Sequence, residues 1–169
     1  DALVKTSRLE SGVLAMTPKR HGIQQLLDAA SAQAAPGAEA KAITLTVEPT
    51  DLTARFDPKW TAEALYNLVD NAVKYTPAGG AVTLRAVGYE LFCRVDVTDT
   101  GPGIPESEQA RIFQRFYRSP SASEAEGVGI GLYLARQIAA GQGGYLKVSS
   151  RPGEGSTFSL FLPRAEERT

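Results

Sequence analysis

Cysteine and histidine are nearly absent from this sequence, and their scarcity excludes several kinds of protein. The single cysteine, Cys93, rules out an internal disulfide, and the single histidine, His21, leaves no Cys/His cluster for zinc. Cys93 lies in the alternating run 91–97, which is typical of a small buried hydrophobe in a strand. A reducing compartment fits this composition best.

The sequence also lacks a long hydrophobic run, a run of basic residues and a strong net charge. Eighteen Lys and Arg face nineteen Asp and Glu, so the net charge of −1 favours neither nucleic acid nor an anionic membrane as a partner. No segment is apolar over the roughly 20 residues that cross a bilayer, and no signal peptide is visible. The absence of a Gly-x-x-x-x-Gly-Lys-Ser/Thr run excludes a P-loop. The 169 residues fit one globular domain.

What is present is an ordered series of helical and strand-like periods. Helices are predicted at 1–11, 22–41 with a kink or break at Pro36-Gly37, 57–75, 106–113 and 128–140. Strands are predicted at 43–47, 53–56, 81–87, 91–98, 145–149 and 157–162, of which the last two form a hairpin. Neighbouring antiparallel strands with helices between them predict an α+β fold whose helices pack on one face of a sheet.

The predicted helix at 57–75 carries polar residues on one face and apolar residues on the other. Since helical residues are about 100° apart, the polar set falls within an arc of roughly 80°: Glu63, Asn67, Asn71 and Lys74. Asn offers a neutral oxygen ligand for a hard cation, and Lys a positive charge for phosphate. A solvated helix face is the plainer interpretation, but two Asn residues in mid-helix are unfavourable and need a reason.

A carboxylate ends the strand at 91–98. Asp99 is in phase with the apolar residues of that strand, and Gly101 and Gly103 allow the backbone to approach a flat base. A carboxylate in such a place needs a donor, which the exocyclic amine of adenine supplies. An acidic turn closed by Gly-Pro-Gly is the alternative.

Glycines also open the helix at 128–140. Gly127, Gly129 and Gly131 would leave N–H groups free for phosphate, and the polar segment upstream excludes a Rossmann strand. That polar segment, 119–126, follows the aromatic stretch 112–118 and predicts a lid, from which Arg115 or Arg118 would reach a terminal phosphate. A surface loop pinned by two phenylalanines is the alternative.

Taken in order, these segments resemble the sequence boxes of the histidine-kinase-like ATPases, the GHKL superfamily. The resemblance covers residues 18–162 and comprises an N box at 63–76, a G1 box at 99–104, an F box at 113–116, a G2 box at 127–132 and a G3 box at 153–158. It implies a Bergerat-type α/β sandwich, with helices on one face of a mixed, mostly antiparallel sheet. This fold would bind ATP and Mg²⁺ under a mobile lid.

The resemblance implies a role for each matching residue. Asp99 would read the adenine amine, and Thr157 would support the base. Phosphoryl transfer would depend on Asn67 and Asn71, which hold Mg²⁺ and phosphates, and on Lys74 and Arg118. The remaining nucleotide contacts would be Tyr75, Gly101, Gly103, Ile104, Tyr117, Gly127, Val128, Gly129, Gly131 and Leu132.

The implied function is that of the catalytic domain of a two-component sensor histidine kinase, which phosphorylates a histidine on a dimerisation domain for relay to a response regulator. His21 is unlike such an acceptor and is expected to be exposed at a helix start. Gyrase-like relatives carry Glu where Asn67 stands, and an amide cannot serve as their base for water. A nucleotide-binding regulatory module and an anti-sigma-type serine kinase are the alternatives.

The chain is expected to have three parts. Residues 1–15 resemble the end of a dimerisation helix and a linker, 16–163 would form the catalytic domain, and 164–169 a polar tail. Because the first residue is Asp and a helix-like segment opens the chain, we expect a fragment that is monomeric by itself. Its parent would be a homodimer in the bacterial cell membrane, with this domain in the cytoplasm.

Overall fold

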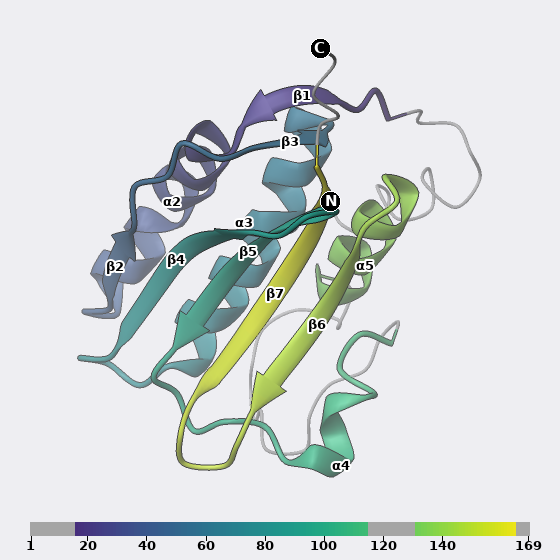
Figure 1. The fold of residues 1–169 in the computed structure, drawn as a ribbon. Coiled ribbons are helices and arrows are strands. Elements are labelled where there is room, and N and C mark those ends of the chain that lie inside the picture. The colour runs from purple at the N-terminus through teal and green to yellow at the C-terminus, as the bar shows by residue number, and fades with distance from the viewer. Residues whose placement is uncertain (1–15, 115–130, 165–169) are drawn as a thin grey trace.

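The fold is a two-layer sandwich in which helices cover one face of a sheet. The structure, a computed structural model, describes residues 16–114 and 131–164. Helices α2, α3 and α5 lie behind the five-stranded sheet, and no helix in the described ranges covers its other face (Figure 1). The predicted α+β class is therefore confirmed. The elements are β1 (Lys19–Gly22), α2 (Ile23–Ala40), β2 (Thr44–Val47), β3 (Thr53–Phe56), α3 (Pro58–Tyr75), β4 (Ala81–Gly88), β5 (Phe92–Asp99), α4 (Glu106–Gln109), α5 (Gly131–Gly141), β6 (Tyr145–Ser150) and β7 (Ser156–Pro163).

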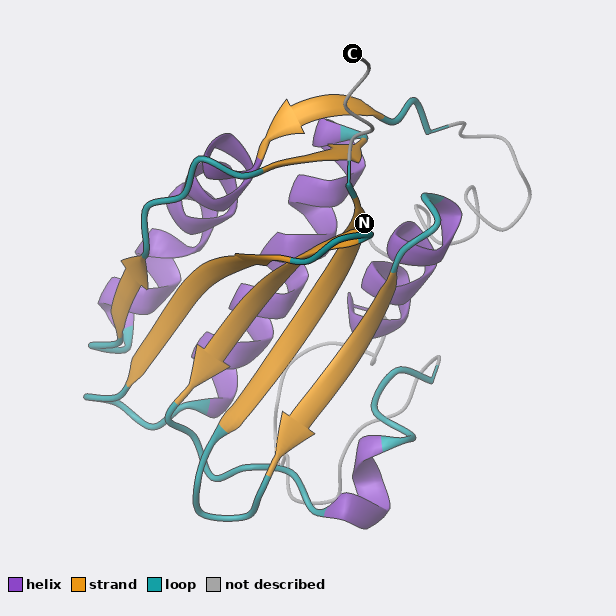
Figure 2. Ribbon diagram, viewed as in Figure 1, coloured by secondary structure: helices purple, strands orange, loops and turns teal. Residues whose placement is uncertain are grey.

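The main sheet is mixed and mostly antiparallel, as predicted. Its strand order is β2-β4-β5-β7-β6, in which only the β2–β4 pair is parallel (Figure 2). A second, two-stranded sheet pairs β1 with β3. The sequence analysis missed β1 and was wrong about His21, which is half-buried in this strand with its ring centroid 5.4 Å from that of Phe56.

Helix α3 begins and ends where its sequence predicts. Asp57 is the N-cap, and its carboxylate accepts a hydrogen bond from the Trp60 N–H at 3.1 Å. Pro58 occupies the first helical position, where the missing N–H costs nothing. The helix ends at Tyr75 because Thr76 is extended before Pro77.

Helix α2 is not broken at Pro36-Gly37, where the sequence predicts a kink or a break. Pro36 lies inside the helix, which continues to Ala40. A proline in a helix interior removes one backbone hydrogen bond and costs about 3 kcal/mol. The small side chains Ala30, Ala34 and Ala38 are buried on both sides of it, so packing of this face against the rest of the core holds the helix together.

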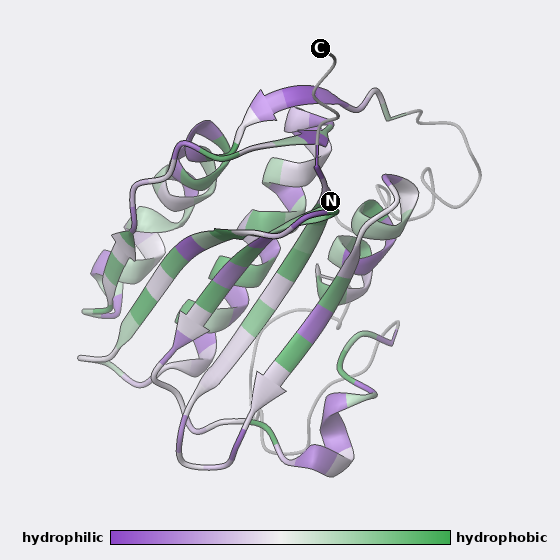
Figure 3. Ribbon diagram, viewed as in Figure 1, coloured by the Kyte–Doolittle hydropathy of each residue, from purple (hydrophilic) through white to green (hydrophobic). Residues whose placement is uncertain are grey.

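The core lies between the helices and the sheet. Residues alternate along β5 and β7 between side chains buried against the helices, most of them apolar, and more exposed side chains that face outward, visible in part as alternating colours in Figure 3. The outward positions include both polar residues and the aromatic residues Phe92 and Phe161. The predicted apolar face of α3 supplies the other layer, with Leu65, Leu68, Val69 and Ala72 all buried. Cys93 is also buried, as predicted, and burial raises the pKa of its thiol to about 11.

A buried polar network joins the start of α3 to the end of α5. Gln142 donates from Nε2 to the Thr61 hydroxyl at 2.8 Å and accepts from the Asp57 N–H through Oε1. The Thr17 N–H donates to Asp57 Oδ2 at 2.9 Å. Burial by itself raises the pKa of Asp57, but hydrogen bonds from Thr17 and Trp60 outweigh it and hold the pKa below its ordinary value. The ionised carboxylate thus anchors the incoming segment to the helix start.

Replacing Asp57 by alanine is expected to lower the free energy of unfolding by about 1–2 kcal/mol at neutral pH, because the helix cap and the Thr17 bonds are lost together. Asp57→Asn keeps a cap acceptor and should cost less. Because the folded pKa is lowered, the stabilisation by Asp57 is present above the ordinary carboxyl pKa and is lost as pH falls through the lowered one. Urea unfolding of the three proteins against pH measures this, and an alanine variant as stable as wild type at neutral pH contradicts it.

Candidate functional site

Asp99 is a buried carboxylate held in one orientation by the backbone. It ends β5 directly opposite Ser156 in β7, and only 8% of its surface is exposed. Its Oδ1 accepts hydrogen bonds from the Gly101 N–H at 2.9 Å and the Ser156 N–H at 3.2 Å. Burial raises the pKa of Asp99, and these two bonds only partly oppose the rise. The sequence-based prediction that Asp99 follows the core face of its strand is therefore confirmed.

The second carboxylate oxygen of Asp99 is left for another donor. Both hydrogen bonds end on Oδ1, and none of the residues in the described ranges donates to Oδ2. A buried carboxylate whose oxygens differ in this way accepts one further N–H group in a fixed direction.

Glycines let the two loops beside Asp99 interlock. Gly103 has φ +78° and lies so close to the Arg151 carbonyl that a Cβ would collide with it. Gly155 has φ +80°, and a Cβ there would collide with the Asp99 carbonyl. Both positions therefore require glycine for two independent reasons, the left-handed backbone and the lack of space. The G1 and G3 segments thus form one packed unit around Asp99.

The polar face of α3 is arranged as predicted. Glu63, Asn67 and Asn71 are half-buried on it. Asn67 Nδ2 donates to the Gly131 carbonyl at 3.2 Å, which joins the N box to the last glycine of the G2 box. Because the amide nitrogen is used in this bond, the Asn67 carbonyl oxygen is the atom that remains for a ligand.

The last turn of α3 lies next to the G1 segment. The Tyr75 carbonyl is 3.1 Å from where a Cβ of Gly101 would be, and the Tyr75 side chain is 37% exposed. Lys74 Nζ lies 3.0 Å from Asp70 Oδ2, in a pair that is about one-third exposed on each side. An exposed ion pair of this kind contributes little to the stability of the fold.

A serine and a glutamine tie the G1 segment to the β6–β7 hairpin. Ser150 Oγ accepts from the Ile104 N–H at 2.7 Å. Gln109 of α4 donates to the carbonyls of both Ile104 and Ser150, at 2.8 and 2.9 Å. In the F box, the Phe113 ring meets that of Phe158 edge-on, with centroids 6.0 Å apart. Sequence reasoning missed Ser150 and Gln109 because only the folded pairing brings them to this loop.

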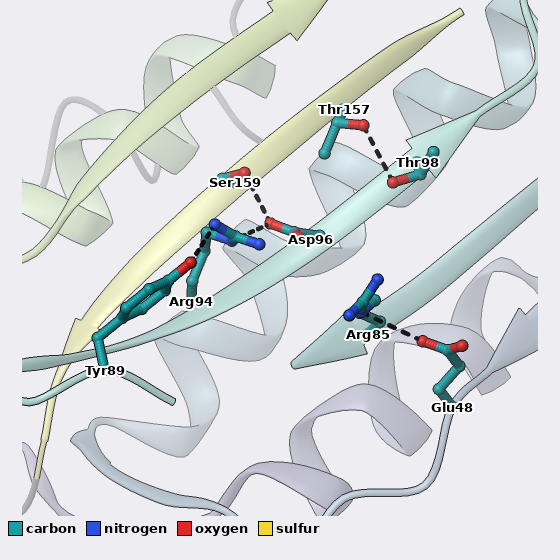
Figure 4. A network of polar contacts seen from close by, with 8 residues as sticks. All are labelled: Glu48, Arg85, Tyr89, Arg94, Asp96, Thr98, Thr157 and Ser159. Carbon is teal, nitrogen blue, oxygen red and sulfur yellow. Dashed lines mark hydrogen bonds and ion pairs between the residues drawn. The ribbon is translucent and has the colours of Figure 1, made fainter. Parts of the chain in front are cut away.

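The prediction that Thr157 supports the base is wrong. Thr157 lies opposite Thr98 in the sheet, and the two hydroxyl oxygens are 3.1 Å apart on the face away from the helices (Figure 4). Ser156, not Thr157, shares the face of Asp99. The alternation of β7 contained this signal, because Ser156 is in phase with the buried residues Phe158 and Leu160.

The open face around Thr157 has its own polar contacts. Asp96 Oδ1 accepts from the Ser159 hydroxyl at 2.7 Å and lies 2.9 Å from Arg94 Nε (Figure 4). Arg94 in turn donates to the Tyr89 hydroxyl at 2.6 Å. These side chains lie across the sheet from Asp99, so they take no part in its site.

Some predicted residues lie outside the described ranges. These are Tyr117, Arg118, Gly127, Val128 and Gly129, together with the predicted lid at 119–126 and the predicted helix remnant at 1–15. Gly131 and Leu132 begin the described part of α5, where Leu132 packs partly buried against the core. The site can therefore be built from the N, G1 and G3 boxes, with Phe113 and Gly131 at its borders.

Within residues 16–114 and 131–164, no group of three or more His, Cys, Asp or Glu side chains could hold a metal ion. No helix in this part of the chain is both long and apolar enough to cross a membrane.

A family model matches residues 56–166, which include all of these boxes. Its description is "Histidine kinase-, DNA gyrase B-, and HSP90-like ATPase". The chain is 42% identical over 131 residues to the adaptive-response sensory kinase SasA of Synechococcus sp. (strain JA-3-3Ab), covering 76% of this chain and 35% of that protein. It is 36% identical over 169 residues to the sensor protein DivL of Caulobacter vibrioides, covering 99% of this chain and 22% of DivL. The chain thus spans about a fifth to a third of these relatives.

Solved structures give the same assignment. The mycobacterial sensor histidine kinase MprB superposes with a TM-score of 0.78 at 28% identity, covering 88% of this chain and all of that one. Full-length ShkA, solved in complex with AMPPNP, superposes with a TM-score of 0.85 at 28% identity, covering 99% of this chain and 35% of ShkA. The sequence boxes, the packing around Asp99 and these likenesses agree, and the chain belongs to the histidine kinase-, DNA gyrase B- and HSP90-like ATPase family, as an ATPase domain of the histidine kinase type.

Proposed function

We propose that this chain is the Mg-ATP-binding catalytic domain of a two-component sensor histidine kinase, which transfers the γ-phosphoryl group of ATP to a histidine elsewhere in its parent protein. The observation that carries the proposal is Asp99, a buried carboxylate with one oxygen fixed by two backbone N–H groups and the other left for a ligand. Asn67, on the polar face of α3, contacts Gly131, and the last turn of the same helix borders Gly101 through the Tyr75 carbonyl.

Recognition of adenine follows from the orientation of Asp99. Its Oδ2 would accept a hydrogen bond from the exocyclic amine, while Oδ1 stays bonded to the Gly101 and Ser156 N–H groups. Guanine presents a carbonyl oxygen at the same position of its ring, and two acceptors facing each other are unfavourable. The carboxylate therefore selects adenine over guanine.

The phosphate end of the nucleotide would lie along α3. The amide oxygens of Asn67 and Asn71 fit Mg²⁺, which takes hard oxygen ligands and is commonly shared with substrate phosphates. When bound, Mg²⁺ would neutralise charge on the phosphate oxygens. Lys74 would leave Asp70 to reach the phosphates. Arg118 and the G2 residues before Gly131 remain predictions for this end of the site.

Asn67 supports transfer to an outside nucleophile over hydrolysis. Where hydrolytic relatives have a glutamate base, this helix has an amide whose nitrogen already donates to Gly131. Glu63 is one turn earlier on the same face, half-buried, and we do not assign it that role. The site is suited to hold ATP in position for in-line attack.

The acceptor histidine would belong to the dimerisation domain of the parent. His21 packs against Phe56 in β1, across the fold from Asp99, so it does not serve as the acceptor. The phosphoryl group would pass to an aspartate of a response regulator. That the parent is a homodimer anchored in the membrane, with this domain in the cytoplasm, remains a prediction.

Asn71→Ala is expected to abolish transfer to a separate protein that contains the parent's histidine-bearing helices, while weakening ATP binding less severely, because the adenine contacts remain. Radiolabelled ATP and a phosphohistidine-stable gel measure the transfer. Glu48→Ala, which removes an exposed carboxylate paired with Arg85 at the sheet edge, is the control with full activity. Wild-type protein that binds ATP but transfers nothing would instead favour a regulatory nucleotide-binding module, and transfer to a serine of a partner would favour an anti-sigma-type kinase.

Asp99→Asn is expected to weaken ATP binding about 10- to 100-fold, because the substitution turns one carboxylate oxygen into a donor that faces the adenine amine. The buried Oδ1 contacts to Gly101 and Ser156 can be kept. Isothermal titration with Mg-ATP measures the loss. Asp96→Asn makes the same chemical change on the opposite face of the sheet (Figure 4) and should bind ATP as wild type does. Equal affinities of the two variants would refute the assignment of Asp99.

Asp99→Asn is also expected to change how the stability of the nucleotide-free protein depends on pH. Because burial raises the folded pKa of Asp99, its ionisation destabilises the fold increasingly as pH rises from the ordinary carboxyl pKa to the raised one. Asp99→Asn lacks this cost. The stability of the variant relative to wild type should therefore rise as pH increases from the ordinary carboxyl pKa to the raised pKa of Asp99, and then level off. Urea unfolding across this range measures the difference, and a flat or falling difference contradicts it.

A further inference from the structure

Thr76 carries a buried hydroxyl for which the structure offers no hydrogen-bond partner. The residue is 0% exposed, and its Oγ1 is without a partner among the described residues. Buried polar groups of this kind are rare in native proteins, and each one requires an explanation. Thr76 follows the last residue of α3, and none of the sequence boxes assigned it a role.

The side chain of Thr76 has two distinct sides. Its methyl group, Cγ2, lies against Gly80, so closely that Gly80 has no space for a Cβ. Its hydroxyl instead borders Gly101, in the segment that follows Asp99. The methyl group packs against Gly80 as part of the fold, whereas the hydroxyl lies beside Gly101 and Asp99 Oδ1.

Three oxygens surround the side of Gly101 that lacks a side chain. The three heavy atoms nearest to the position a Cβ would take are Asp99 Oδ1 at 3.0 Å, the Tyr75 carbonyl oxygen at 3.1 Å and Thr76 Oγ1 at 3.5 Å. We call these atoms the three-oxygen cradle. The carboxylate and the carbonyl only accept hydrogen bonds, so the Thr76 hydroxyl is the donor of the cradle.

Adenine needs such a donor beside its amine. If Asp99 accepts from the exocyclic amine, the neighbouring ring atom N1 is an acceptor on the same edge of the base. The N–H groups of Gly101 and Ser156 are already committed to Asp99 Oδ1. This leaves the Thr76 hydroxyl as the side-chain donor bordering Asp99.

We propose that Thr76 is a base-recognition residue of this site, whose hydroxyl donates toward N1 of adenine, directly or through one water held in the three-oxygen cradle. The inference rests on the proposed ATP binding. It predicts that the hydroxyl contributes nothing to the nucleotide-free fold and contributes to affinity only when N1 is present.

Two substitutions separate the hydroxyl from the methyl group. Thr76→Val keeps the shape and the methyl contact with Gly80 but removes the hydroxyl, and Thr76→Ser keeps the hydroxyl. Replacing a buried polar group that has no partner by an apolar one of the same shape is neutral or stabilising. The valine variant should therefore unfold at the same or a higher temperature than wild type, whereas a hydroxyl needed for the fold would make it less stable.

Binding is measured by isothermal titration of wild type and both variants with Mg-ATP and with Mg-1-deaza-ATP, in which a C–H group replaces N1. Thr76→Val should bind ATP about 3- to 10-fold more weakly than wild type, as expected for one lost hydrogen bond. Thr76→Ser should bind ATP within about twofold of wild type. Because the pair forms a double-mutant cycle between protein and ligand, wild type and Thr76→Val should bind 1-deaza-ATP equally.

Several results overturn the inference. One is an ATP affinity of Thr76→Val equal to that of wild type, and another is the same loss of affinity for 1-deaza-ATP as for ATP. Lower stability of the nucleotide-free valine variant together with restored stability in the serine variant would show that the hydroxyl serves the fold. Wild-type protein that binds neither nucleotide overturns the proposed function itself, and with it this inference.

Discussion

The register between β5 and β7 is the constraint on which the candidate site depends. By pairing Asp99 with Ser156, it turns the carboxylate to the helix side of the sheet and supplies one of the two backbone N–H groups that fix Oδ1. The remainder of that sheet face is apolar, so the same alternation that buries Val95, Val97 and Phe158 also buries the charge. A slip of β7 by one residue would place Thr157 opposite Asp99 and turn Phe158 and Leu160 to the open face. The pairing of β5 with β7 therefore determines both how the core packs and how the carboxylate is presented to a ligand.

Around Asp99 the chain repeatedly accepts arrangements that do not favour the nucleotide-free fold. A carboxylate is buried with a raised pKa, and the buried hydroxyl of Thr76 has no hydrogen-bond partner among residues 16–114 and 131–164. Polar groups that lack hydrogen-bond partners in the absence of a ligand are concentrated at ligand-binding sites. By contrast, the buried polar network of Asp57, at the other end of α3, is hydrogen-bonded throughout. The two ends of one helix thus serve different purposes, binding at one and anchoring at the other.

The parts of the fold that could be predicted depend on sequence signals that act within a few residues. The Asp57-Pro58 start and the Pro77 stop define α3 because caps and prolines act within a few residues. The period of 3.6 placed Asn67 and Asn71 on one face, and the period of 2 placed Asp99 in the core phase. Packing can override a local signal, as at Pro36, where the helix does not break because buried alanines pack on both sides of it. The edge strand β1 was missed because four residues with little alternation give no clear period.

By itself, the sequence determined the class of fold, the bounds of most elements, the order of the boxes and the family, since each depends on residue type and spacing along the chain. Tertiary structure alone decided which atoms meet. It paired Asp99 with Ser156, brought Gln109 and Ser150 to the loop ending at Ile104, and turned the Thr76 hydroxyl toward Gly101. These contacts join residues from separate elements, and they are fixed by strand register and by the packing of α3 on the sheet. Such long-range pairing leaves no periodic trace in a single sequence.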